Sequence, residues 1–221
     1  MGKIIKGILL IITLISLYII FSVGLGWFWT IGNSPNAEKI NTILVNLSYS
    51  YIAGFVFYIL ISYLPYRLKA ERLKPVINQK ISRLYNQIEA CVQTFNQELD
   101  SNALKTITLE ELTEKIKNNG MYGCSFFSSK SGVQFNNLSY LKSRKVFILD
   151  AICFLLEYKE YMSTEQILYI ERIRDSDFFY FIDFPEGTEI TKFYSSDEVK
   201  EIISKKLYEM IESVKYLKKS I

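Results

Sequence analysis

The sequence contains no histidine, and its three cysteines are widely spaced. Histidine is the commonest general base and the commonest metal ligand, so its absence removes the most frequent routes to acid–base and metal chemistry. Cys91, Cys124 and Cys153 form no CxxC pair, whereas a structural zinc site usually takes four ligands in close pairs. We therefore expect free thiols in a reducing cytosol, with no metal and no cofactor.

Charge is missing from two long stretches near the start of the chain. Gly7–Ala37 contains no charged residue, and after Glu38 and Lys39 neither does Ile40–Tyr66. Each stretch is longer than the roughly 20 residues that cross about 30 Å of hydrocarbon as a helix. The first apolar run also exceeds the roughly 7–15 residues of a signal-peptide core, so we expect a retained anchor. The sequence therefore predicts two transmembrane helices in residues 1–66.

Basic residues flank the two stretches on the same side. Lys3 and Lys6 come before the first stretch, and the connection between the stretches holds only Glu38 and Lys39. Four more basic residues follow the second stretch: Arg67, Lys69, Arg72 and Lys74. The positive-inside rule then places both termini in the cytoplasm. The chain is rich in Ile, Lys, Asn and Tyr, which suggests an AT-rich bacterial genome, so we expect the spans in a bacterial inner membrane. The basic segment suits an anionic inner leaflet, so the lipid bilayer is the first expected partner.

Small and polar residues recur at a spacing of four within the spans. Asn46, Ser50 and Gly54 share one helical face in the second span, and Ser22 and Gly26 have the same spacing in the first. Such a face allows close helix contact, and an unpaired amide in lipid is costly. The face either packs inside the hairpin or forms a self-association seam, which could line a pore in an oligomer. Neither span contains Asp, Glu, Lys or Arg, which argues against ion-coupled transport.

The chain from Arg67 onward is polar and nearly neutral. It holds 23 of the 26 basic and 22 of the 23 acidic residues. This balance gives no general argument for a nucleic-acid partner. We expect a mainly α fold in three parts: a two-span hairpin (1–66), a basic juxtamembrane and heptad helix (67–99), and a mostly helical cytoplasmic domain (100–221).

Apolar residues after Pro75 alternate at spacings of four and three. This pattern is typical of a heptad seam, and its members are Ile77, Ile81, Leu84, Ile88, Cys91 and Phe95. The seam either packs on its own helical domain or joins protomers as a parallel coiled coil below the membrane.

Capping signals place the remaining helices. Thr108–Glu111 and Ser163–Gln166 resemble capping boxes, so each is expected to start a helix. A long helix is expected over 138–161, and a last helix is expected to start at Ser195 or Ser196 and end at Lys218 and Lys219, where lysines suit the helix dipole. The aromatic stretch Asp177–Phe184 is expected to be buried core or a short strand, which leaves open a short strand pair.

Several residue sets look catalytic but lack the required context. Asp150 with Glu157 and Lys159 mimics a nuclease acid and ExK set, yet that site needs a β-hairpin and the pattern here is helical. Gly123–Ser131 lacks the second glycine of a phosphate-binding loop. The acidic patch after Arg174 lacks EF-hand spacing, and we interpret it as solvated; its members are Asp175, Asp177, Asp183, Glu186 and Glu189.

The second span carries a family resemblance. Leu47–Pro65 places Gly54 before Phe55-Val-Phe-Tyr and ends in Leu-Pro ahead of a basic helix. In this it resembles uncharacterised bacterial two-span proteins, some of which resemble membrane effectors of anti-phage defence, such as retron or abortive-infection modules. The resemblance implies that a cytoplasmic sensor releases the spans to damage the membrane. It implies no catalytic residues.

Two functions are compatible with these observations. The first is a non-enzymatic inner-membrane effector, whose cytoplasmic domain senses a protein partner or ligand and whose hairpin oligomerises or disrupts the bilayer. The second is a membrane-anchored scaffold or adaptor whose spans only tether the cytoplasmic domain. We expect a homo-oligomer in the first case, and the sequence offers no clear nucleic-acid site.

Overall fold

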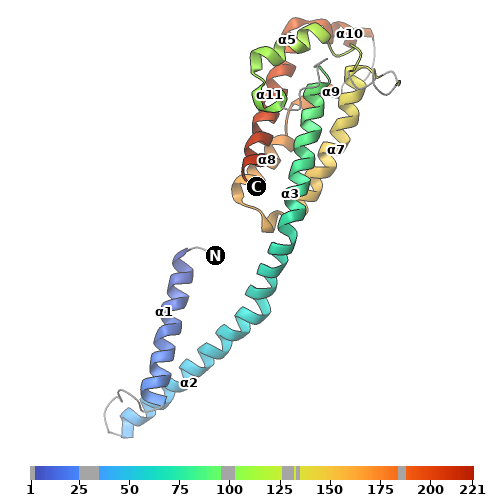
Figure 1. Cartoon of the computed structure of the whole chain (residues 1–221). Coiled ribbons are helices and arrows are strands. Elements are labelled where there is room, and N and C mark those ends of the chain that lie inside the picture. Colours follow the sequence, from blue (N-terminus) through green and yellow to red (C-terminus); the bar gives the residue numbers. More distant parts are fainter. Residues whose placement is uncertain (1–2, 25–34, 96–102, 126–131, 133–134, 184–187) are drawn as a thin grey trace. The chain divides into compact units, whose positions relative to one another are not determined.

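The computed structural model of the chain describes residues 3–24, 35–95, 103–125, 132, 135–183 and 188–221 (Figure 1). These residues are mainly helical, which confirms the expected fold class at this level. Contacts divide the chain into two compact units, Met1–Glu71 and Arg72–Ile221. We call them the N-terminal unit and the C-terminal unit.

The N-terminal unit contains two helices that pack on each other. Helix α1 (Lys3–Ile19) continues into a π-helical turn, η1 (Ile20–Gly24), and both contact α2 (Pro35–Tyr58). Helix α2 begins at Pro35, a position that suits proline because the first helical N–H needs no intrahelical partner. The expected turn before Pro35 lies outside the described residues.

A second π-helical turn, η2 (Ile59–Tyr63), follows α2 and ends beside a proline. Pro65 has no N–H to donate to the residue four positions back, and its ring crowds that residue's carbonyl. The widened turn relieves this conflict, since the Leu64 N–H donates to the Ile59 carbonyl, five positions back. Helix α3 (Leu64–Gln93) follows without an intervening loop and contains a second proline, Pro75.

The C-terminal unit is built around α3 and the last helix, α11 (Asp197–Lys219). Helix α11 packs against α5 (Leu109–Asn119) and α8 (Thr164–Arg174). Helix α7 (Asn137–Glu157) contacts α8. The shorter elements are α4 (Ala103–Thr106), the 3-10 turn η3 (Lys159–Tyr161), α9 (Phe178–Ile182) and α10 (Thr188–Ser195). Figure 1 shows α3 beside α7, and the Lys80 ammonium lies 4.4 Å from the Phe154 ring centroid.

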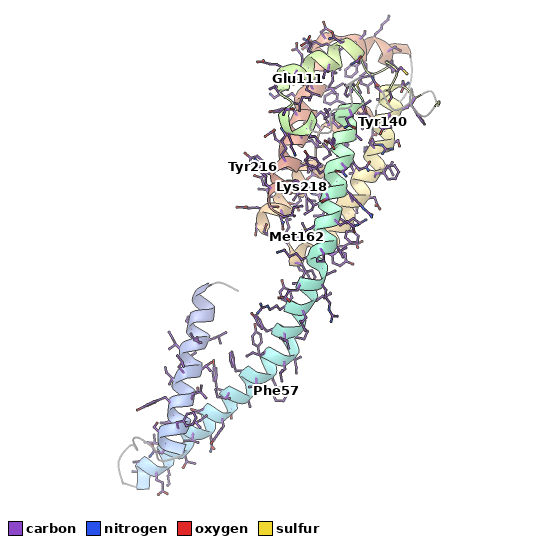
Figure 2. All side chains as sticks on the ribbon, in the orientation of Figure 1. Phe57, Glu111, Tyr140, Met162, Tyr216 and Lys218 are labelled. Carbon is purple, nitrogen blue, oxygen red and sulfur yellow. The ribbon has the colours of Figure 1, made fainter. Side chains whose placement is uncertain are left out.

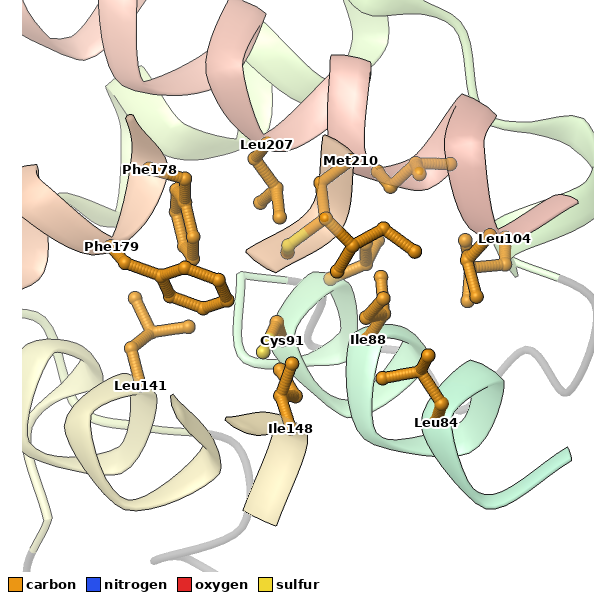
Figure 3. Close-up of a cluster of buried hydrophobic side chains, with 14 of the residues drawn as sticks. Leu84, Ile88, Cys91, Leu104, Leu141, Ile148, Phe178, Phe179, Leu207 and Met210 are labelled. Atoms are coloured by element: carbon orange, nitrogen blue, oxygen red, sulfur yellow. The ribbon is translucent and has the colours of Figure 1, made fainter. Parts of the chain in front are cut away.

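The heptad seam, which extends along α3 and ends at Phe95 just after it, lies in the core of the C-terminal unit. All six seam residues are at most 5% exposed. Figure 3 shows Leu84, Ile88 and Cys91 of α3 together with Ile148 of α7 and Met210 of α11. The seam is therefore covered by helices of its own chain, as in the first of the two arrangements expected from the sequence. Contacts assign α3 from Arg72 onward to this unit, so the described part of the expected 67–99 segment that follows Glu71 shares its core with the later helices.

Side-chain caps fix the starts of three helices. The Thr108 hydroxyl accepts a hydrogen bond from the Glu111 N–H (3.2 Å), and Ser163 and Gln166 form a complete capping box. Asn136 caps α7 by accepting from the Ser139 N–H (2.7 Å). Helix α5 ends at Gly120, whose φ of 60° favours glycine. These short-range signals place α5 and α8 where the sequence predicted them.

The aromatic stretch is helical, so its interpretation as a strand is wrong. Phe178, Phe179 and Ile182 of α9 are buried, whereas Tyr180 is 66% exposed. A spacing of one, then three, puts the buried residues on one helical face. In the part of the chain that the structure describes, β pairing is limited to one isolated bridge, Cys124 with Asn136. The long helix expected to reach residue 161 ends at Glu157.

The three thiols are expected to differ sharply in reactivity. Cys124 and Cys153 are exposed, whereas Cys91 is buried and its burial raises the pKa to about 12. Because only the thiolate attacks an alkylating reagent, native protein should be labelled at two cysteines and at the third only after unfolding. Mass spectrometry after a maleimide pulse, with and without urea, measures this. Rapid native labelling of Cys91 would contradict the described core.

Alkaline pH is expected to destabilise the C-terminal unit. Burial raises the pKa of Cys91 from its ordinary value of 9.0 to about 12, and that of Tyr194 from 10.0 to about 12. Between these limits the unfolded chain loses protons that the folded chain keeps, so stability is complete below pH 9 and falls as pH rises toward 12. Urea midpoints measured across this range should decrease, and less steeply in Cys91→Ala. A urea midpoint that rises with pH over this range would contradict the expectation.

Candidate membrane interface

The second long helical stretch contains an apolar segment that the rest of the chain leaves almost uncovered. Asn36–Gln93 contains an 18-residue window of mean hydropathy 1.7, of which 6% is buried, and it is long and apolar enough to cross a membrane. Gly7–Val23 is a shorter apolar helix. Phe57 is 64% exposed and Ile61 69% exposed, and Figure 2 shows Phe57 projecting away from α1. A core helix of a soluble protein would have these side chains covered.

One face of α2 makes the contact with α1. Ser48 is buried on this face, while Tyr51 and Phe55 are half-buried and their rings stack with centroids 6.2 Å apart. The Tyr51 hydroxyl donates to the Leu9 carbonyl (3.1 Å) and lies 3.3 Å from the Thr13 hydroxyl. These polar contacts satisfy groups that would otherwise be costly in an apolar setting. They also fix which side of α2 faces α1.

The polar stripe of α2 lies on the other side. Asn46, Ser50 and Gly54 are all exposed, and a Cβ added to Gly54 would meet nothing within 4 Å. At about 100° per residue, Asn46 is rotated by about 200° from Ser48. The stripe is therefore not used in the contact with α1 and is available to another molecule.

In the first span, Ser22 and Gly26 have the same spacing as the residues of the stripe. Ser22 is 1% exposed, and its hydroxyl donates to the Tyr18 carbonyl (2.6 Å). It is a packing residue inside the N-terminal unit and does not extend the outward stripe. Gly26 lies outside the described residues.

The basic residues that follow the apolar stretch lie on α3. Arg67, Lys69, Arg72 and Lys74 are all exposed. Arg67 forms an ion pair with Glu71 (3.1 Å), and because both side chains are exposed the pair contributes little to stability. The segment from Arg67 to Lys74 therefore has a net positive charge, with four basic residues against the single acid Glu71.

A groove of about 550 Å³ lies between α1 and the second helix of the N-terminal unit. Its walls are apolar and aromatic, and it is lined by Leu9, Leu10, Phe55, Tyr58, Ile59, Ser62, Tyr63 and Tyr66. Several of these residues belong to η2, so the widened turn before Pro65 forms part of the wall. Pro65 was the only sequence signal for it, since the lining residues look like ordinary span residues.

Among the described residues of the C-terminal unit, the acids of the sets that resembled catalytic sites are exposed or lie in ion pairs. Asp150 and Glu157 are exposed on α7. The described acids of the patch after Arg174 form ion pairs: Asp175 with Arg174, Asp177 with Lys206 and Asp183 with Lys145. Among the described residues, no three His, Cys, Asp or Glu gather as metal ligands. Glu186 and most of Gly123–Ser131 lie outside the described residues, as does the side chain of Glu189.

A second cavity, of about 650 Å³, lies between α8 and α11. Tyr169 and Tyr216 stack there with centroids 5.2 Å apart, and Lys206 and Lys215 pair with the nearby carboxylates. The internal ion pairs leave a mixed polar surface without a dominant charge.

No protein-family model, curated protein or solved structure matches this chain.

Proposed function

We propose that this protein is an integral membrane protein of the bacterial inner membrane. The N-terminal unit crosses the bilayer twice, and both termini and the C-terminal unit lie in the cytoplasm. The observation that carries this proposal is the uncovered apolar surface of α2 and η2, where Phe57 and Ile61 are about two-thirds exposed. Lipid covers such a surface, and the basic residues on α3 suit the cytoplasmic leaflet.

The spans self-associate through the outward stripe of α2. Asn46 and Ser50 are polar groups on a face that α1 does not cover, and an amide in hydrocarbon is stabilised by a hydrogen-bonding partner. Gly54 on the same face has open space around it, so a second helix can approach closely. A second copy of the chain presents the same face and completes the contact.

The protein acts as a non-enzymatic effector. Its C-terminal unit senses a cytoplasmic protein partner or ligand, and its spans then oligomerise further or disrupt the membrane. The second span leads through η2 directly into α3, and α3 supplies the heptad seam of the C-terminal core. A change of packing around α3 therefore has a continuous covalent and helical route to the span. The resemblance of Leu47–Pro65 to defence effectors supports a role in anti-phage defence.

The alternative is a scaffold whose spans only tether the C-terminal unit. The division of the chain into two units, each with its own contacts, favours this second function. Replacing residues 1–66 with an unrelated two-span anchor separates the two functions. For an effector, the intact chain depolarises the membrane and slows growth, and the replaced chain does neither. If the biological effect survives the replacement, the spans are a passive tether.

A further inference from the structure

We propose that the groove between α1 and the η2 region is a binding site for one anionic phospholipid of the cytoplasmic leaflet. The inference rests on the proposed membrane location and goes beyond it by naming a ligand class and its site. The groove holds about 550 Å³, within the roughly 300–1,000 Å³ of small-molecule sites. Its apolar walls match an acyl chain.

The two ends of the groove differ in chemistry. At one end the Tyr51 hydroxyl is bonded to the Leu9 carbonyl, where α1 and α2 are in contact. Beyond it the lining becomes amphipathic, with Ser62, Tyr63 and Tyr66 in the direction of α3. Tyrosine hydroxyls and a serine can donate to the ester and glycerol oxygens of a lipid, as tyrosine does at membrane interfaces.

Basic residues lie near the polar end of the groove. Arg67 directly follows Tyr66 and lies one helical turn after Tyr63, and both tyrosines line the groove. Lys69 lies in the next half-turn of α3. An anionic headgroup at this end would meet a guanidinium, which binds phosphate in a bidentate manner. The exposed pair with Glu71 is weak enough to be rearranged by a bound phosphate.

The widened turn explains why the groove is present here. Ile59 and Ser62 belong to η2, and π-helical turns often occur at functional sites. Pro65 maintains this turn because it cannot supply the bond that a regular helix requires. The groove therefore depends on a proline placed two residues before the basic segment.

The test uses the full chain in nanodiscs made of equal parts phosphatidylglycerol and phosphatidylethanolamine. Either lipid carries a photoreactive diazirine in its acyl chain, and labelled peptides are identified by mass spectrometry. We expect labelling by phosphatidylglycerol to concentrate on peptides that contain Leu9 and Ile59. Ser62→Phe fills the groove and should reduce this labelling about tenfold. The matched control Ile61→Phe, on the exposed side of η2, should leave it unchanged.

Arg67→Gln should remove the preference for phosphatidylglycerol over phosphatidylethanolamine while labelling at the groove remains. The inference is overturned by labelling spread evenly around the helix, by undiminished labelling of Ser62→Phe, or by equal labelling with both lipids in the unaltered chain. Extraction of native membranes with alkaline carbonate tests the membrane location separately from the lipid site. Release of the chain would contradict the membrane location itself, whereas a retained chain without groove labelling would contradict only the lipid site.

Discussion

Replacing Leu84 with alanine is expected to lower the free energy of unfolding of the C-terminal unit by about 2–5 kcal/mol. Leu84 is fully buried in the core, where it lies with Ile88 of α3 and Leu104 of α4 (Figure 3). The lost side chain removes buried apolar area and leaves a cavity that close-packed neighbours fill only in part.

Arg83→Ala is the matched control, because Arg83 is the exposed neighbour of Leu84 on α3. Its effect should stay within about 0.5 kcal/mol. The measurement is a urea titration of the detergent-solubilised chain, with maleimide labelling of the buried Cys91 as the signal for unfolding. A Leu84→Ala protein whose urea midpoint is unchanged but which no longer oligomerises would assign the seam to a coiled coil between protomers.

Gly123→Ala is expected to destabilise the same unit by about 1–3 kcal/mol. A Cβ at this position would lie 2.0 Å from the Asn119 carbonyl oxygen, so the backbone after α5 would have to move. Gly123 also accepts a hydrogen bond from the Asn137 N–H (2.9 Å), which connects this segment to the start of α7. Moving the segment would weaken that connection as well.

The control for Gly123 is the same substitution at Gly54, where an added Cβ meets nothing. Gly54→Ala should not change the urea midpoint reported by Cys91. Equal midpoints for Gly123→Ala and the unaltered chain would show that the close approach to Asn119 is not required for folding.

Local signals in the sequence predicted much of the C-terminal unit. Thr108 and Ser163 mark helix starts because their hydroxyls satisfy backbone N–H groups within three residues, so no distant contact is involved. The heptad spacing of Ile77 to Phe95 predicted a buried face in the same way. It could not say what covers that face, because Met210 of α11 lies more than a hundred residues away in the chain.

The features that the sequence did not settle depend on contacts between distant residues. The spacing of Asn46, Ser50 and Gly54 defines a face, but only the contact of Tyr51 with Leu9 shows that α1 takes the opposite side. Phe178 and Phe179 in an aromatic run suit a strand or a helix equally well by composition. The groove beside η2 needs the widened turn and α1 packed beside it. Pro65 signals the turn, but no sequence motif signals that packing.

We propose above that the outward stripe of α2, Asn46, Ser50 and Gly54, joins two copies of the chain in a membrane. Disulfide crosslinking in native membranes tests it, with Cys124 and Cys153 replaced by serine and the buried Cys91 left in place. Ser50→Cys and Ser48→Cys are identical changes on opposite faces of α2. A disulfide needs the two Cα atoms within about 7 Å, so we expect a crosslinked dimer for Ser50→Cys and a monomer for Ser48→Cys. No dimer at Ser50, or equal dimer at both positions, would contradict it.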